Sequence, residues 1–234
     1  MEYVICSCPR TGSHLLAEAL AAIGAGRPRE YLNPITSQGN AMVPRPRFLE
    51  PDPDGYFQRI RGENTVDGIF GIKVHYPQLA VFDGGADGLV RLLPAARYVS
   101  VTRRRTLRQA VSYAKATQSR VWRAGLREHR RPRFNHLRII KHLLFVAQEV
   151  EQWERFYQRH GIKPLNLVYE ELDEDYGATM RRVIGFLGLE ADVPPRPLAR
   201  QADQITEEWV DRSLGFLRGN GLLMRSIRRI ATSW

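Results

Sequence analysis

The segment Tyr3–Leu20, YVICSCPRTGSHLLAEAL, leaves few choices for the architecture around it. An apolar run typical of a buried strand ends in the polar loop PRTGSH, and an apolar helical pattern follows directly. A strand that turns through glycine and hydroxyl residues into a helix presents free N–H groups at the positive helix end. Arg10 adds a bidentate cation. The segment therefore predicts a phosphate- or sulfate-binding loop; the alternative is an ordinary strand-to-helix turn capped by Ser13.

Strand-like and helix-like patterns alternate along the rest of the chain. The expected strands are Tyr3–Cys8, Ile69–His75, Ala96–Thr102 and Leu165–Tyr169. The expected helices are Ser13–Ile23, Thr106–Gln118, Asn135–His160, Ala178–Leu187 and a tail from Thr206. This alternation favours an α/β fold, a P-loop-like and mostly parallel sheet flanked by helices, with ligands beyond the carboxyl ends of the strands. We expect a single domain, residues 1–234, with a helical tail at 206–234.

Two expected helices have apolar faces. In Thr106–Gln118 the face consists of Leu107, Ala110, Val111 and Ala114. In Asn135–His160 the residues expected to point inward are Leu137, Ile140, Leu144, Val150, Trp153 and Phe156. Between residues 27 and 61, by contrast, six prolines exclude long regular elements and predict a long functional or mobile loop. Aromatic surfaces are expected in this loop at Tyr31, Phe48, Tyr56 and Phe57.

Charge and cysteine usage narrow the class of protein. Lys plus Arg is 35 and Asp plus Glu is 25, so the net charge of +10 favours an anionic partner such as nucleic acid, a nucleotide, an acidic substrate or a membrane surface. No run approaches roughly 18 uncharged apolar residues, and no signal-peptide pattern opens the chain. Cys6 and Cys8 share one strand and cannot pair with each other, so we expect them in the core of a cytoplasmic protein.

The loop at Pro9–His14 differs from a Walker phosphate loop. It has one glycine, no lysine and a shorter span. Magnesium would need an acidic strand end, but the strand IFGIKVH ends with Lys73 and His75. A metal-dependent NTPase or kinase is therefore disfavoured, and no metal ligands are predicted.

A second candidate anion site is VTRRRTLRQAVS, Val101–Ser112. Its three arginines, Arg103, Arg104 and Arg105, lie between a strand and a helix, and Ser112 lies two turns into that helix. Cations at the N-terminus of a helix oppose the helix dipole. A bound anion would therefore account for the three arginines better than the alternative, a basic helix start that only faces solvent. Two anion sites on neighbouring strand ends suggest a ligand with two separated phosphates, and a nucleotide with 3′- and 5′-phosphates fits.

Several blocks in order carry a family resemblance. They are CPRTGSHLLAEAL, GRPREYLN, FGIKVHYPQL, ARYVSVTRRRTLRQAVSYAKATQSRVW and RQADQITEEWV, within Tyr3 to Val210. The chain resembles the bacterial sulfotransferase family typified by trehalose 2-sulfotransferase. The resemblance implies a P-loop-like fold, 3′-phosphoadenosine 5′-phosphosulfate (PAPS) as donor, and transfer of its sulfuryl group to a hydroxyl of a sugar or glycolipid. Adenosine 3′,5′-bisphosphate would be the product, and family members form homodimers.

The resemblance also assigns donor-binding residues. The first loop, which would hold the 5′-phosphosulfate, comprises Pro9, Arg10, Thr11, Gly12, Ser13 and His14. The 3′-phosphate would be held by Ser112 and one arginine of the 103–105 run; the usual spacing of eight favours Arg104, with Arg103 next. His14 stands where many relatives have Ser or Thr. Its imidazole either approaches the transferred group or lies on the helix surface.

For the base that takes the acceptor proton, the matching segment GRPREYLN implies Glu30. The alternatives are a solvent-facing Glu30 paired with Arg27 or Arg29, and His75 as the base. Lys73 either touches the sulfuryl group or is structural. Arg10 would stabilise charge on the sulfuryl oxygens and the leaving phosphate.

On the acceptor side, the resemblance places Trp122 in a matched block, with core packing as its alternative. We also assign Tyr31 and the proline-rich loop at 27–61 to this side. The arginines from Arg120 to Arg133 form either a lid, an acidic-acceptor site or a solvated loop.

Other interpretations remain open. One is a P-loop-type kinase, and another is a basic nucleic-acid-binding module, although its aromatic residues are not interleaved with basic runs and no specific nucleic-acid motif appears. The tail piece LLMRSIRRI either contacts the inner membrane surface, in keeping with a lipid-linked acceptor, or packs in the core or against a second copy.

Overall fold

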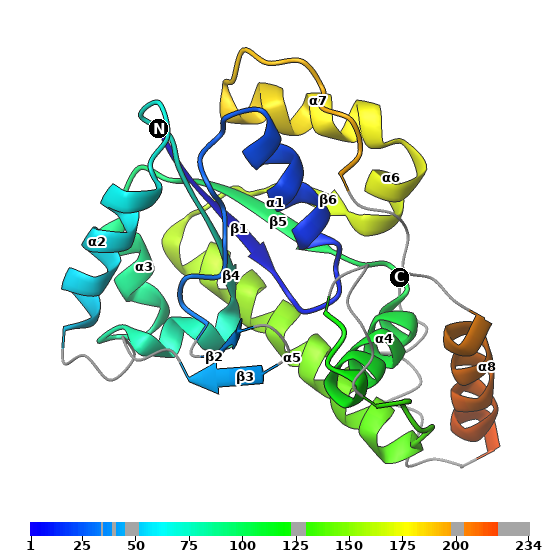
Figure 1. Cartoon of the computed structure of the whole chain (residues 1–234). Helices are drawn as coiled ribbons and strands as arrows, with labels where there is room; N and C mark the ends of the chain where they lie inside the picture. The colour runs from blue at the N-terminus through cyan, green and yellow to red at the C-terminus, as the bar shows by residue number, and fades with distance from the viewer. Residues whose placement is uncertain (34, 39–40, 45–51, 123–129, 198–203, 220–234) are drawn as a thin grey trace.

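The computed structural model describes residues 1–33, 35–38, 41–44, 52–122, 130–197 and 204–219. At its centre is a four-stranded parallel sheet in the order β4-β1-β5-β6 (Figure 1). The strands are β1 (Glu2–Ser7), β4 (Phe70–His75), β5 (Arg97–Thr102) and β6 (Leu165–Val168). The predicted α/β fold with a parallel sheet is confirmed.

Strand register brings the functional loops together. Ser7 at the end of β1 is aligned with His75 on β4 and with Val101 on β5. The three strands therefore end at one edge of the sheet, and the chain segments that follow them meet there. This is the edge at which open parallel sheets bind their ligands.

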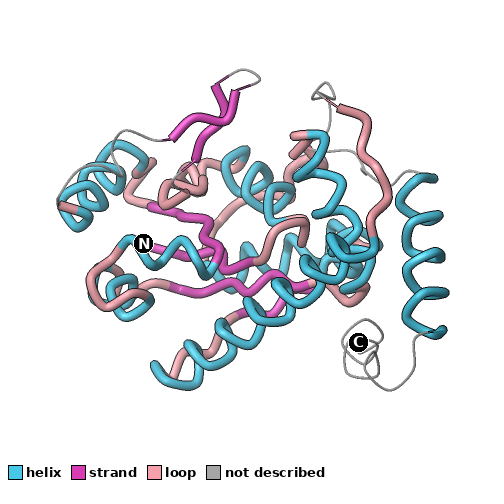
Figure 2. The backbone as a smooth tube through the Cα atoms, turned by 90° about the horizontal axis from the view of Figure 1, so that it is seen from below, coloured by secondary structure: helices cyan, strands magenta, loops and turns pink. Residues whose placement is uncertain are grey.

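Helices cover both faces of the sheet, as Figures 1 and 2 show. One face carries α1 (Ser13–Ala22), α6 (Tyr169–Glu174) and α7 (Tyr176–Leu187), and the other carries α2 (Pro53–Asn64), α3 (Ala86–Leu92) and α5 (His136–His160). Alternation along β1 builds both cores: Tyr3 and Ile5 pack towards α1, while Val4 and Cys6 pack towards α2 and α5. A third core joins α4 (Thr106–Ser119), α8 (Gln204–Gly219) and the start of α5.

The segment between residues 27 and 61 corrects one expectation. A hairpin of β2 (Ile35–Gln38) and β3 (Ala41–Pro44) interrupts it, and α2 begins within it at Pro53. Proline is compatible with the first helical turn, and the Asp52 side chain caps the helix by accepting from Gly55 N at 2.8 Å. The prediction of no long regular element was therefore wrong.

The aromatic residues of this segment also differ from expectation. Tyr56 and Phe57 are buried in the core rather than forming a loop surface. The reason is the helix itself, which turns both rings onto the sheet. Phe48 lies outside the described residues.

The apolar faces of the two longer helices were predicted with unequal success. All four residues expected inward on α4 are buried. On α5, Trp153 and Phe156 are buried as predicted, but Leu137 and Leu144 are 75% and 44% exposed. The buried residues of its first half are Ile139, Leu143 and Val146. This half packs on α4 and α8, and apolar residues occur on both its sides, so periodicity alone did not identify the inward one.

Two further expectations concern the cysteines and the membrane. Cys6 and Cys8 are both buried free thiols, as predicted. Among the helices in the described part of the chain, none combines the length and apolarity that crossing a membrane requires. The tail piece Leu222–Ile230 lies outside the described residues.

Candidate active site

The loop after β1 turns sharply and leads directly into the N-terminus of a helix. Arg10 and Gly12 both have left-handed backbone conformations, with φ of 69° and 78°. Thr11 Oγ1 donates to Cys8 O at 3.0 Å and holds the turn. Helix α1 then begins at Ser13. Its N-cap residue is Gly12, so no side chain caps the helix, and its first turn holds no acidic residue. Since the first N–H groups of a helix lack intrahelical partners, this end is suited to an anion.

Gly12 is required by close packing as well as by its φ angle. A Cβ at this position would lie 2.3 Å from Cδ2 of Tyr169, the first residue of α6. The guanidinium of Arg103 lies over the same ring, 4.7 Å from its centre. Tyr169 thus joins the loop to the end of β5. Sequence analysis missed Tyr169, because an aromatic residue after a short strand carries no distinctive signal.

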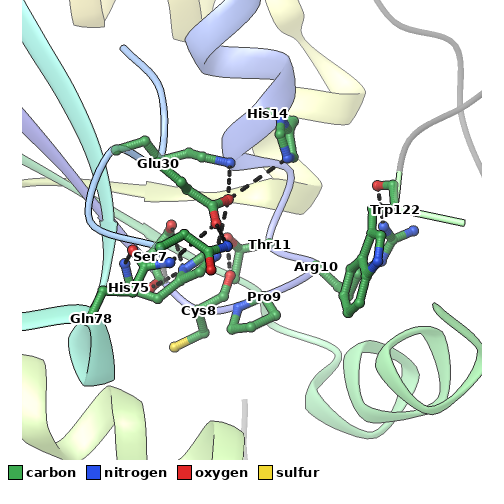
Figure 3. Close-up of polar contacts among 12 residues, drawn as sticks. Ser7, Cys8, Pro9, Arg10, Thr11, His14, Glu30, His75, Gln78 and Trp122 are labelled. Carbon is green, nitrogen blue, oxygen red and sulfur yellow. Dashed lines mark hydrogen bonds and ion pairs between the residues drawn. The ribbon is translucent and has the colours of Figure 1, made fainter. Parts of the chain in front are cut away.

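The Arg10 side chain extends from the loop towards α4. Its Nε donates to Ser112 Oγ at 3.0 Å and its Nη1 donates to Trp122 O at 2.6 Å. Figure 3 shows it directed towards Trp122 and away from Glu30. Burial and the neighbouring charge of Arg103 lower the pKa of Arg10 to about 10. The structure therefore brings together Arg10 and Ser112, which the sequence assigned to different phosphates.

The three arginines after β5 occupy different environments. Arg103 is largely buried and donates from Nη1 to Arg10 O at 3.2 Å. Burial lowers the pKa of Arg103, although Tyr169 and Glu170 oppose this. Arg104 is 48% exposed and pairs with Glu171 at 3.1 Å. Arg105 is exposed as the residue that precedes α4. Only Arg103 among the three lies beside Arg10.

Glu30 lies at the centre of a cluster of polar side chains (Figure 3). Lys73 N donates to Arg29 O at 3.1 Å, which ties the Glu30 segment to β4. Oxygen Oε1 of Glu30 lies 2.6 Å from Lys73 Nζ, 3.4 Å from His75 Nε2 and 3.8 Å from His14 Nε2. Its Oε2 accepts from Asn33 Nδ2 at 2.9 Å and from Gln78 Nε2 at 3.2 Å. The structure thus pairs Glu30 with β4 and α1 rather than with the neighbouring arginines in sequence.

Asn33 and Gln78 were not predicted as site residues. Both occur in the blocks that carried the family resemblance, but neither has a charge or a motif that indicates a role. Gln78 belongs to the short 3-10 helix η2 (Tyr76–Val81), and its Oε1 accepts from His75 N at 3.0 Å.

The charges of the cluster determine its protonation states. Burial raises the pKa of Glu30, but Lys73 and His75 lower it more, so the net pKa lies well below the usual value. Burial lowers the pKa of His75 and Glu30 raises it, with a net rise. His75 Nδ1 lies 2.8 Å from Ser7 O; because a carbonyl only accepts, Nδ1 carries a proton and Nε2 faces Glu30. Glu30 is therefore a carboxylate at neutral pH.

The two acceptor-side residues of the sequence analysis lie in different places. Tyr31 is buried in the core, where its ring stacks on Phe70 at 6.5 Å. Trp122 packs at 6.1 Å against Tyr113, a residue of α4 that sequence analysis missed. The indole Nε1 of Trp122 is buried without a hydrogen-bond partner among the described residues. Part of the basic segment that follows, 123–129, lies outside the described residues.

Comparison with known proteins is consistent with this arrangement. The Stf0 sulphotransferase family model matches residues 2–214. Two relatives are named trehalose 2-sulfotransferase: one from Mycobacterium tuberculosis is 29% identical and one from Mycolicibacterium smegmatis is 28% identical. In each case the match covers 90% of this chain and 93% of the relative.

Solved structures show the same fold. A sulfotransferase from Alicyclobacillus acidocaldarius superposes with a TM-score of 0.53 and 19% identity, covering 97% of this chain and 98% of the other. The sulfotransferase domain from the curacin biosynthetic pathway superposes with a TM-score of 0.57 and 14% identity, covering 98% and 95%.

Proposed function

Because the chain belongs to the Stf0 sulphotransferase family, we propose that it transfers a sulfuryl group from PAPS to a hydroxyl of a carbohydrate. One observation supports this most: two neighbouring guanidinium groups, Arg10 and Arg103, lie on the same sheet edge as the Glu30–Lys73 pair. The first pair suits a donor with separated anionic groups, and the second suits proton removal from an acceptor. The relatives' name supports a sugar acceptor of the trehalose type.

The residues of the loop fit such a donor. The guanidinium groups of Arg10 and Arg103 are only partly exposed and lie beside a helix N-terminus without an acidic residue, where a bound anion stabilises like charges. Glu170, 3.7 Å from Arg103 Nε, compensates part of this charge. We assign the 5′-phosphosulfate to the loop from Pro9 to His14. We assign the 3′-phosphate to Arg103 and Ser112, since Arg103 rather than Arg104 lies beside Arg10.

Glu30 is the proposed base. When bound, the donor supplies an activated sulfuryl group, which bonds to the acceptor oxygen as its bond to the phosphate oxygen breaks. Glu30 takes the acceptor proton, although its ion pair with Lys73 makes it a weak base at rest. An anion at the loop would compete for the Lys73 ammonium and so raise the pKa of Glu30 when the proton must move. His75, with a protonated Nδ1 anchored to Ser7 O, orients Glu30.

Other parts of the assignment stay predictions. Membrane contact or dimer contact through the tail from Leu222 rests on residues outside the described part of the chain. A glycolipid acceptor and a homodimer likewise rest on the family resemblance.

Calorimetry with adenosine 3′,5′-bisphosphate tests donor binding. We expect Arg103→Ala to weaken binding about 100-fold, because two charge-assisted hydrogen bonds contribute about 3 kcal/mol. The matched variant Arg104→Ala should bind within about threefold of wild type, since that side chain pairs with Glu171. No binding to the wild type, or tighter binding to long DNA, would overturn the function. A larger loss in Arg104→Ala would restore the spacing-based assignment.

Transfer to trehalose tests the base. Glu30→Gln should lower kcat by roughly 10²–10⁴-fold while bisphosphate affinity stays within a few-fold of wild type. A variant that binds the bisphosphate and transfers at the full rate would show that Glu30 is not the base.

A further inference from the structure

The chain segments that follow β5 and β6 leave the sheet side by side. Thr102 at the end of β5 is aligned with Val168 at the end of β6, because the two strands are parallel neighbours. The three arginines at 103–105 follow β5, and Tyr169 and Glu170 follow β6 as the start of α6. The two segments therefore meet at the sheet edge to which we assign the donor.

Glu170 joins these two segments through both of its carboxylate oxygens. Arg104 N donates to Oε2 of Glu170 at 2.8 Å, and Arg105 N donates to Oε1 at 3.1 Å. The Glu170 side chain is only 17% exposed. Helix α4 begins directly afterwards at Thr106, and its N-cap residue Arg105 makes no side-chain cap. A carboxylate from α6 thus supplies, from within the chain, a negative charge that is favourable at this helix N-terminus.

Glu170 also lies beside Arg103, the arginine to which we assign the 3′-phosphate. Its Oε1 is 3.7 Å from Arg103 Nε. The ring of the preceding residue, Tyr169, lies 4.7 Å from the Arg103 guanidinium, and Arg103 Nη1 donates to Arg10 O at 3.2 Å. These contacts orient the guanidinium before any donor binds, so less side-chain freedom is lost on binding.

A carboxylate at this place has two effects of opposite sign on a bound phosphate. Its charge repels the phosphate, so on electrostatics alone the removal of Glu170 would strengthen binding. Its hydrogen bonds hold the backbone that carries Arg103, so on geometry the removal of Glu170 would weaken binding. Both oxygens accept from backbone N–H groups, and the carboxylate is therefore committed to the chain itself. This favours the second effect.

We propose that Glu170 is a positioning residue for the donor: it fixes the segment at 103–105 so that Arg103 meets the 3′-phosphate. Glu170 acts through Arg103 and takes no part in the transfer step. The assignment rests on the proposed function, because it takes the 3′-phosphate of the donor as the ligand of Arg103.

Two nucleotides that differ only in the 3′-phosphate test this role. Affinities for adenosine 3′,5′-bisphosphate and adenosine 5′-monophosphate are measured by calorimetry, directly or by competition. Glu170→Ala should weaken bisphosphate binding about tenfold and change monophosphate binding less than about twofold, since only the 3′-phosphate contact is displaced. Glu170→Gln keeps one acceptor oxygen, so its loss should be smaller. General damage to the fold would instead weaken both nucleotides alike.

A double variant tests whether Glu170 acts through Arg103. Arg103→Ala/Glu170→Ala should bind the bisphosphate within about threefold of Arg103→Ala alone, because the group that Glu170 orients is already absent. The matched control is Glu171→Ala, which removes the same charge from the next residue, whose carboxylate pairs with Arg104 and Arg182. Its bisphosphate affinity should stay within about twofold of wild type. If Glu170→Ala does not fold, Glu170→Gln replaces it in each comparison.

The outcomes separate this proposal from the proposed function. Unchanged or tighter bisphosphate binding in Glu170→Ala would overturn the positioning role and leave the sulfotransferase assignment intact. Equal losses for the two nucleotides, or additive losses in the double variant, would overturn it as well. Failure of the wild type to bind the bisphosphate would instead overturn the proposed function.

Discussion

Lys73 is buried on β4, 1% exposed, with its ammonium 2.6 Å from the Glu30 carboxylate. A buried lysine keeps its charge only when an anion lies beside it, because desolvation otherwise favours the neutral form. The pair is therefore interdependent, and removing one partner of a buried pair typically costs about 3–5 kcal/mol. Glu30 also accepts from Asn33 and Gln78 and lies 3.4 Å from His75, so its charge keeps other partners when Lys73 is removed.

A double-mutant cycle measures this interdependence. Lys73→Met should lower the free energy of unfolding by about 3 kcal/mol, since Glu30 keeps its other partners. The double variant Glu30→Gln/Lys73→Met should lose clearly less than the sum of the two single losses. Urea denaturation of the four proteins checks this. Additive losses would contradict an interaction between the two groups.

At the scale of elements, the unit that matters is β1, its loop and α1, closed from outside by α6. The loop adopts left-handed conformations at Arg10 and Gly12, and Tyr169 packs on the glycine. A side chain at residue 12 would displace the ring that also supports Arg103. The geometry of the donor loop therefore depends on an element more than 150 positions later in the chain.

Two alanine substitutions separate backbone strain from this packing. Gly24, like Gly12, has a positive φ, but its added Cβ would meet nothing within 4 Å. Gly24→Ala should cost about 1–2 kcal/mol of unfolding free energy and leave bisphosphate binding unchanged. Gly12→Ala should cost more and also weaken bisphosphate binding, as thermal denaturation and calorimetry would show. Equal effects in the two variants would exclude a role for Tyr169.

At the scale of the whole molecule, the interior contains a carboxyl that titrates near neutral pH. Glu149 has a pKa of about 7 in the folded protein, against an ordinary value of 4.5. Between these values the folded protein binds the extra proton, so stability falls as pH rises, by about 1.4 kcal/mol per pH unit. His75, with its raised pKa, adds a decline of the same sign as pH rises from its ordinary value through its folded one.

Replacing the Glu149 carboxyl should make the free energy of unfolding less dependent on pH. The unfolding free energy of Glu149→Gln minus that of the wild type should increase by about 3 kcal/mol as the pH rises from 4.5 to 8. The decline due to His75 is present in both proteins and cancels to first order in the difference. Urea denaturation at several pH values measures it. A constant difference across this range would contradict a buried carboxyl with a raised pKa.

Much of the fold followed from the hydrophobic periodicity of the sequence and from the residues that end its helices and strands. The strands and the larger helices lie within a few residues of their predicted bounds, because apolar alternation, glycine stops and polar loops act locally. The helix at Pro53 and the inward face of the first half of α5 were missed. Both depend on what the element packs against, which local patterns do not record.

The chain's amino-acid pattern alone predicted a phosphate-type loop and a basic segment after β5, because each rests on residue type and spacing. The choice of Glu30 as the base came from the family resemblance. Tertiary structure decided the pairing: Lys73 with Glu30, Arg103 rather than Arg104 beside Arg10, and Tyr169 on Gly12. It also buried the Glu149 carboxyl near Cys8 and His75. These contacts join positions far apart in sequence, so they depend on strand register and helix packing.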